Sequence, residues 1–200
     1  MFIIKDWKKE VFTIPNLLSL FRLALIPVYV MIYLNAGDDL SLHFVAAGVL
    51  AVSCLTDLVD GQIARRFHMI STVGKVLDPV ADKATQFALI VCLSIRYPVL
   101  WAVVVLFFLK ELFQLVAGIV FLRKRKMLDG ALIVGKICTT VLFLSLIVMV
   151  LFPTLPDGWI YTIAATDSIF LGISFIGYYL AYFGKNVKVQ DLPENNETAG

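Results

Sequence analysis

Four aspartates fall within one short stretch of an otherwise apolar chain. Asp57 and Asp60 are three positions apart, and Asp78 and Asp82 are four positions apart. Residues three or four positions apart lie on the same face of an α-helix. Each pair is therefore predicted to present two carboxylates side by side.

The two pairs are expected to meet, because the short segment 68–72 between them predicts a turn between antiparallel helices. Four carboxylates at such close range repel one another, in a region where even one charge is costly. Oxygen ligands at this density predict bound Mg²⁺ or Mn²⁺. Two such ions would suit displacement at phosphorus, because a pair of metals neutralises phosphate oxygens and steadies the leaving group.

Small and basic residues accompany the first aspartate pair. Gly61 and Ala64 share its helical face, and their size would let a substrate approach the backbone closely. Arg65 follows one turn later and could contact a diphosphate. In the alternative interpretation, the aspartates are hydrated groups at helix ends, paired with nearby lysines and arginines. That would explain a single aspartate, but four at helical spacing on two neighbouring helices favour a cation site.

The elements that carry these residues are predicted to lie in a membrane. Of the 200 residues, 60% are hydrophobic and 16% are charged, and the mean hydropathy is +0.89. Soluble domains carry about 25% charged residues, so the composition fits only the membrane class. The formal net charge of +2 gives no electrostatic footprint for nucleic acid, and we expect no such partner.

The predicted fold is all-α, a polytopic bundle of six transmembrane helices in one domain, residues 14–183. Each apolar stretch is long enough to cross a hydrocarbon core of about 30 Å. Residues 1–13 predict a short amphipathic helix on the membrane surface, or else a basic leader, and the polar tail 184–200 is expected to be disordered. The six stretches are 15–34, 41–65, 73–95, 99–122, 131–152 and 159–183.

Charge placement predicts the orientation. The loops after the second and fourth stretches and the two termini hold nearly all the loop lysines and arginines, whereas the opposite loops hold Arg96 alone. Positive residues favour the cytoplasmic side. We therefore expect a protein of the cell membrane with both termini and the aspartate site facing the cytoplasm. Arg22, inside the first stretch, is expected to reach the interface or to pair with an acid.

At the aspartates the sequence resembles the CDP-alcohol phosphatidyltransferase family, whose signature reads DxxDGxxARx8GxxxDxxxD. All eight fixed positions match with the required spacing. The matching residues are Asp57, Asp60, Gly61, Ala64, Arg65, Gly74, Asp78 and Asp82.

The resemblance implies a six-span homodimeric enzyme of the membrane. It implies that Asp57, Asp60, Asp78 and Asp82 bind the metals, and that Asp82 also acts as the general base. The CDP site would comprise Asp60, Gly61, Ala64, Arg65 and Gly74. The acceptor alcohol would attack the lipid-side phosphorus, and CMP would leave.

The segments 14–22 and 77–83 resemble the bacterial phosphatidylglycerophosphate synthase branch, which implies CDP-diacylglycerol as donor and glycerol 3-phosphate as acceptor. Cations for the acceptor phosphate would be Lys110, Arg123 and Lys136. This sequence has Lys110 where that branch usually has arginine, and Cys138 where it has a second lysine.

Other functions remain open at this point. Cardiolipin synthases, which use phosphatidylglycerol, share the aromatic last stretch seen at 178–183. Inositol phosphate or serine are further acceptors in the family. Outside it, the alternatives are a cation transporter, an intramembrane prenyltransferase and a lipid-binding scaffold. A single aspartate hairpin without internal repeats disfavours the transporter.

Overall fold

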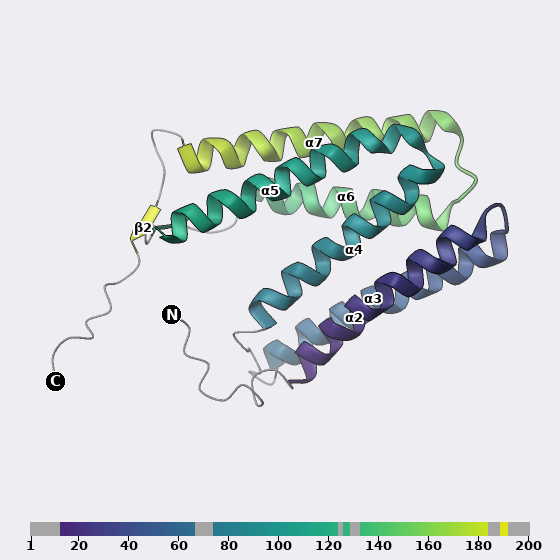
Figure 1. Ribbon diagram of the computed structural model, residues 1–200, viewed down its shortest axis with the longest axis horizontal. Coiled ribbons are helices and arrows are strands. Elements are labelled where there is room, and N and C mark those ends of the chain that lie inside the picture. The colour runs from purple at the N-terminus through teal and green to yellow at the C-terminus, as the bar shows by residue number, and fades with distance from the viewer. Residues whose placement is uncertain (1–12, 67–73, 124–125, 129–132, 184–188, 192–200) are drawn as a thin grey trace. The chain divides into compact units, whose positions relative to one another are not determined.

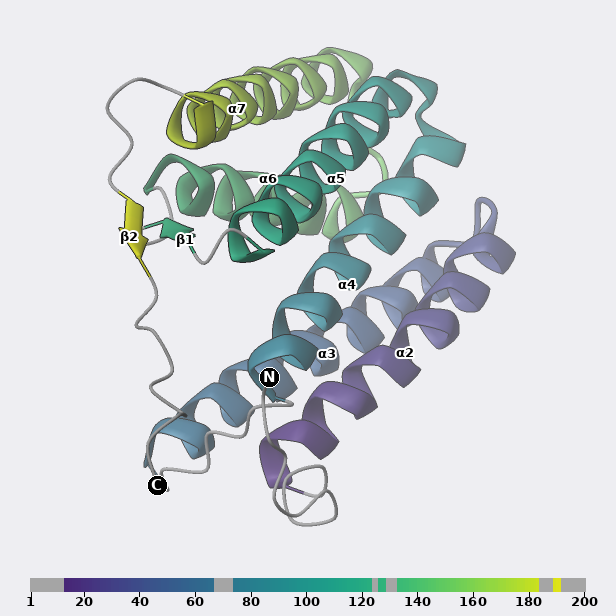
Figure 2. The ribbon, with the colours of Figure 1, turned by 60° about the vertical axis from the view of Figure 1, so that its left-hand side comes forward.

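The computed structural model describes residues 13–66, 74–123, 126–128, 133–183 and 189–191 (Figures 1 and 2). One 3₁₀ turn, η1 (Pro98–Leu100), and two strands, β1 (Lys126–Leu128) and β2 (Val189–Asp191), accompany the long helices. These helices are α2 (Ile14–Ala36), α3 (Leu40–Arg66), α4 (Gly74–Arg96), α5 (Trp101–Arg123), α6 (Ile133–Leu151) and α7 (Asp157–Phe183).

The helices coincide with the apolar stretches, so the predicted helical membrane fold is confirmed at this level. In lipid, a helix satisfies its backbone hydrogen bonds internally, which is why an apolar stretch of this length forms one. Among the described residues, five helices are long and apolar enough to cross a membrane: α2, α3, α5, α6 and α7. The chain is thus a multi-pass membrane protein.

Two parts of the predicted architecture stay predictions. Helix α4 has 23 residues, but Asp78, Asp82 and Lys83 in its first half shorten its apolar part, and it is not among the five candidate spans. The sixth crossing is therefore not confirmed. The proposed interfacial helix, 1–13, lies outside the described residues except for Thr13.

The turn between α2 and α3 has a clear local cause. Gly37 ends α2 with a φ of 52°, a left-handed conformation that glycine adopts without strain. Asp39 then caps α3, because its Oδ1 accepts a 2.8 Å hydrogen bond from the backbone N–H of Ser41. Gly37 thus ends one helix, and Asp39, two positions later, begins the next.

A short strand pair involves part of the C-terminal tail, which the sequence predicted to be disordered. Strands β1 and β2 are antiparallel, with Met127 opposite Gln190. Val189–Asp191 belong to the segment predicted to be disordered, but in the structure their backbone groups hydrogen-bond to β1. The rest of the tail lies outside the described residues.

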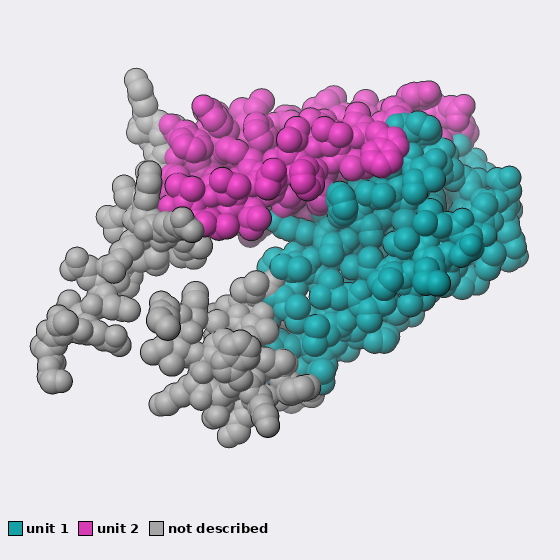
Figure 3. Space-filling view, in the orientation of Figure 1, with its two compact units in different colours: residues 1–98, 146–155 teal, residues 99–145, 156–200 magenta. Residues whose placement is uncertain are grey.

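The chain forms two compact units, coloured separately in Figure 3. Unit 1 comprises residues 1–98 and 146–155, and unit 2 comprises residues 99–145 and 156–200. Helices α2, α3 and α4 are therefore in unit 1, whereas α5, α7 and both strands are in unit 2.

Unit 1 is built on α2, which packs against both α3 and α4. Ala46 of α3 and Ala81 of α4 are fully buried, and such small residues let helices approach closely. At the end where α2 turns into α3, Arg96 donates to the carbonyl oxygen of Gly37 (2.8 Å) and to Nε2 of His43 (2.9 Å). This polar contact ties the end of α4 to the turn.

In unit 2, α5 packs against α7 through aromatic rings. Phe113 lies at the centre of this cluster, and the centroid of its ring is 5.0 Å from that of Phe175. The ring centroids of Tyr179, Tyr182 and Phe183 lie 6.2–6.3 Å from that of Phe113.

The outward faces of helices in both units are apolar too, as at Met31 and Leu115, which are 65% and 62% exposed. In a membrane, lipid covers such side chains.

Candidate active site

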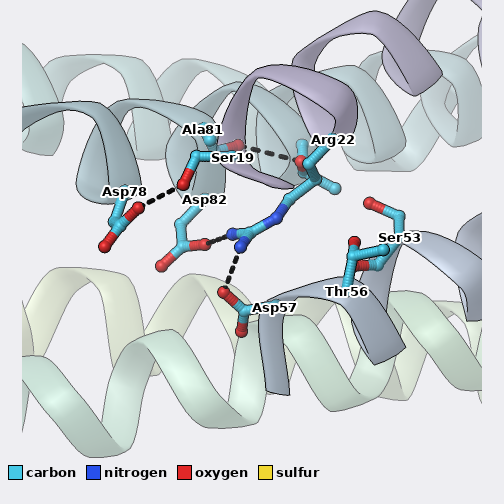
Figure 4. A network of polar contacts seen from close by, with 9 residues as sticks. Ser19, Arg22, Ser53, Thr56, Asp57, Asp78, Ala81 and Asp82 are labelled. Atoms are coloured by element: carbon cyan, nitrogen blue, oxygen red, sulfur yellow. Dashed lines mark hydrogen bonds and ion pairs between the residues drawn. The ribbon is translucent and has the colours of Figure 1, made fainter. Parts of the chain in front are cut away.

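Two of the four motif aspartates meet at one arginine. Asp57 lies in the second half of α3 and Asp82 in the first half of α4, and Arg22 reaches both from α2 (Figure 4). Nη2 of Arg22 is 2.5 Å from Oδ1 of Asp57, and Nη1 pairs with Oδ1 of Asp82. The expectation that Arg22 pairs with an acid is confirmed, with two acids on different helices.

A third motif aspartate is held by the same helix. Oγ of Ser19 donates a hydrogen bond to Oδ1 of Asp78, as Figure 4 shows. Ser19 precedes Arg22 by three positions, and Asn16 precedes Ser19 by three, so these polar residues share one face of α2. All three are buried. Helix α2 therefore presents a polar stripe to the aspartate helices.

Burial divides this cluster into an inner and an outer side. The side chain of Arg22 is 3% exposed, whereas those of Asp57 and Asp82 are 46% and 51% exposed. Arg22 thus contacts the carboxylates from the packed interior of unit 1. The carboxylates themselves remain accessible to an ion or a substrate.

The remaining signature residues have known places in the helices. Asp60, Gly61, Ala64 and Arg65 lie in the last turns of α3, but their side chains are outside the description. Gly74 begins α4 and is buried. The predicted turn at 68–72 is likewise outside the described residues. The roles of these residues in a CDP site stay predictions.

The described carboxylates fit a cation by their chemistry. All are hard oxygen donors of the kind that Mg²⁺ and Mn²⁺ prefer. Asp57 and Asp82 already form ion pairs with a positively charged group, the guanidinium of Arg22. In the described part of the chain, no group of three or more His, Cys, Asp or Glu side chains is placed to hold a metal ion. Asp60, the fourth predicted ligand, has a side chain outside the description, and the metal site stays a prediction.

The three cations predicted for the acceptor phosphate belong to unit 2, whereas the aspartates belong to unit 1. Lys110 is buried, and its Nζ is 2.6 Å from Oε1 of Glu111 and 5.9 Å from the ring centroid of Tyr178. Lys136 is exposed on α6. Arg123 is the last residue of α5, and its side chain is not described. Their shared role stays a prediction.

Sequence reasoning missed two polar contacts. Ser19 was not predicted to meet Asp78, although its helical spacing from Arg22 was a usable signal. Asp167 of α7 is 1% exposed and accepts a 2.6 Å hydrogen bond from Oγ of Ser145 in α6. An acid inside an apolar stretch is itself a signal, because it needs a partner there.

Comparison with known proteins agrees with the signature. Residues 12–177 match the family model described as CDP-alcohol phosphatidyltransferase. All eight fixed signature residues, and Ser19 and Arg22, lie within this range. The match covers most of the chain, including the whole of α2, α3 and α4.

Several curated proteins are similar to the chain. A cardiolipin synthase (CMP-forming) of Streptomyces coelicolor is 33% identical over 173 residues, which are 84% of this chain and 76% of that protein. The CDP-diacylglycerol–glycerol-3-phosphate 3-phosphatidyltransferase of Escherichia coli is 40% identical over 91 residues, 45% of this chain and 48% of that protein. Its Bacillus subtilis counterpart is 35% identical over 106 residues, which are 48% of this chain and 55% of that protein. The chain spans about half the length of several of the curated relatives it matches.

Proposed function

The chain belongs to the CDP-alcohol phosphatidyltransferase family, and we propose that it transfers a phosphatidyl group from CDP-diacylglycerol to glycerol 3-phosphate. One structural observation carries this proposal: Asp57, Asp78 and Asp82, from two helices, are bound by one face of α2. Carboxylates gathered in this way suit phosphoryl chemistry. Membership in a transferase family favours the enzyme over the cation transporter considered from the sequence.

The proposed reaction is a displacement at the lipid-side phosphorus of the donor. The acceptor oxygen forms a new bond to this phosphorus while its proton passes to the Asp82 carboxylate. The bond from the phosphorus to the bridging oxygen breaks, and CMP leaves with that oxygen. A side chain that is 51% exposed can be reached by an acceptor, which is why Asp82 suits the role of general base.

Asp57, Asp60, Asp78 and Asp82 would hold Mg²⁺ or Mn²⁺, two ions in each site. Bound there, such ions would neutralise the charge of the diphosphate. Asp60, Gly61, Ala64, Arg65 and Gly74 would bind the CDP group, with Arg65 donating to phosphate oxygens. These assignments rest on the match of the signature.

The acceptor is proposed from relatives. The Escherichia coli and Bacillus subtilis proteins carry glycerol 3-phosphate in their names, and Lys110, Arg123 and Lys136 would supply cations for its phosphate. A second acceptor, phosphatidylglycerol, is favoured by one observation. The Streptomyces coelicolor cardiolipin synthase aligns with 84% of the chain, a longer match than the other two relatives.

We further propose the cell membrane as the location, with both termini and the aspartate site on the cytoplasmic side, and a homodimer as the assembly. The orientation rests on the placement of lysines and arginines in the loops. The dimer rests on the family resemblance.

The deciding experiment measures CMP release by the purified protein in detergent, with CDP-diacylglycerol and Mg²⁺ or Mn²⁺. The acceptors are glycerol 3-phosphate, phosphatidylglycerol, inositol 1-phosphate and serine, each tested alone. We expect release with glycerol 3-phosphate, reduced about hundredfold or more in Asp82→Asn because a general base contributes about 10²–10⁴-fold. Asp157→Asn, which changes an exposed aspartate in the first turn of α7 that no proposed role involves, is the control and should keep the activity.

Each acceptor result has a distinct meaning. Release with phosphatidylglycerol in place of glycerol 3-phosphate would move the chain to the cardiolipin synthase reaction with the same site. A folded protein that releases no CMP with any acceptor would refute the proposed function.

A further inference from the structure

We propose that Arg22 is a positioning residue of the aspartate site, which sets Asp57 and Asp82 at the separation and orientation that bound divalent cations require. The inference rests on the proposed function, because it assumes that these carboxylates bind metal. It assigns a task to α2, which lies outside the aspartate signature.

The contacts of Arg22 are suited to this task. Its two terminal nitrogens bind one oxygen each, Oδ1 of Asp57 and Oδ1 of Asp82. The planar guanidinium holds these nitrogens at a constant separation and in one plane. One rigid group thus fixes two carboxylates that belong to different helices.

Burial shows from which side Arg22 acts. Its side chain is 3% exposed, while about half of each aspartate side chain is exposed. A cation that enters from the exposed side meets carboxylates already oriented from the buried side. Groups that orient metal ligands in this way commonly change metal affinity by about 10–100-fold when they are removed.

Charge gives a second reason for an arginine at this place. Three described aspartates in one small region would repel one another and push α3 and α4 apart. The positive charge of Arg22 offsets part of this repulsion while leaving a net negative site. A buried arginine is itself costly unless it is paired, so the aspartates and the arginine stabilise each other.

Ser19 has the corresponding role for Asp78. Its hydroxyl is buried and donates to Oδ1 of Asp78, one turn of α2 before Arg22. Helix α2 packs against both α3 and α4, so its polar face is held at a constant position relative to them. Three carboxylates are thus oriented by two residues of one helix.

The test measures Mn²⁺ affinity directly, by electron paramagnetic resonance of free Mn²⁺ titrated against the purified protein without substrate. Arg22→Gln removes the positive charge and the planar guanidinium with its two terminal nitrogens, and we expect Mn²⁺ to bind about 10–100-fold more weakly. Arg22→Lys keeps the charge but replaces the two guanidinium nitrogens by a single ammonium nitrogen, so it should restore the affinity only in part. The melting temperature of each variant shows that binding is measured on folded protein.

Two further variants keep the test decisive. Arg96→Gln removes an arginine at the other end of unit 1, where it contacts Gly37 and His43, and should leave Mn²⁺ affinity unchanged. Ser19→Ala is the smallest change, and remains informative if Arg22→Gln does not fold. We expect it to weaken Mn²⁺ binding several-fold.

Unchanged or tighter Mn²⁺ binding in Arg22→Gln would overturn the inference, since Arg22 would then only stabilise the fold or compete with the metal. If that variant binds Mn²⁺ normally but releases no CMP, the inference fails while the proposed function stands. If the unaltered protein binds no Mn²⁺, both the inference and the metal-dependent function fail.

Discussion

Charged side chains inside apolar helices determine their own surroundings, because each needs a partner that water would otherwise supply. Arg22 meets this need with two carboxylates from two other helices. Asp167 meets it with one hydroxyl, that of Ser145. The first arrangement gathers residues of the family signature. The second lies in unit 2 and joins α6 to α7.

The contact between Ser145 and Asp167 yields a stability prediction. Ser145→Ala leaves the buried carboxyl group of Asp167 without this donor, and we expect the free energy of unfolding to fall by about 1–3 kcal/mol. Thermal unfolding in detergent measures the change. Thr140→Ala is the control on the same helix, because the Thr140 hydroxyl donates to a carbonyl of its own helix, that of Lys136. Equal losses in the two variants would contradict the prediction.

Among the elements, α2 and α5 show two ways of holding helices together. Helix α2 contacts α3 and α4 through polar side chains at one end and through small or aromatic residues elsewhere. Helix α5 contacts α7 through aromatic rings around Phe113. Lipid is as apolar as these rings, so association in unit 2 depends on close packing and not on removal of apolar surface from water.

The aromatic cluster makes this dependence measurable. Phe113→Ala removes the ring that four aromatic side chains of α7 surround, and we expect a loss of about 1–3 kcal/mol in the free energy of unfolding. Leu112→Ala is the neighbouring control, because Leu112 is 44% exposed and lies outside the cluster. Unfolding of both variants in the same detergent gives the comparison. A loss in Leu112→Ala as large as that in Phe113→Ala would show that the rings contribute no specific packing.

For the whole molecule, the distribution of positive charge among the loops predicts the orientation in the membrane. Lysines and arginines concentrate in alternate loops, and this bias orients membrane proteins during insertion. With the aspartate signature at the end of α3 and the start of α4, the same bias predicts that the proposed site lies at the cytoplasmic face. A soluble acceptor such as glycerol 3-phosphate would reach it there.

Labelling of single cysteines tests this orientation. In a background where Cys54, Cys92 and Cys138 are replaced by alanine, Asp38→Cys lies in the turn between α2 and α3 and should react with an impermeant maleimide in intact cells. Lys126→Cys, in β1, should react only after the membrane is permeabilised. The opposite pattern would place the aspartate site outside the cell.

The sequence was sufficient to predict the helices and to single out the four aspartates as candidates for the site. Helix bounds agree with the apolar stretches within a few residues, as at α3 (Leu40–Arg66), predicted as 41–65. Such agreement is expected because helix formation and helical spacing are local properties of the chain. The same locality is the reason why Asp57 and Asp60, and likewise Asp78 and Asp82, could be predicted from spacing alone to share a helix face.

Only the tertiary structure decided which side chains meet these aspartates. Ser19 and Asp78 are 59 positions apart, and Arg22 and Asp82 are 60 apart, so no local pattern pairs them. From the sequence, Arg22 could equally have reached the membrane interface. The packing of α2 against α3 and α4 placed it between two carboxylates, because a buried arginine needs acids and helix packing sets which acids lie within its reach.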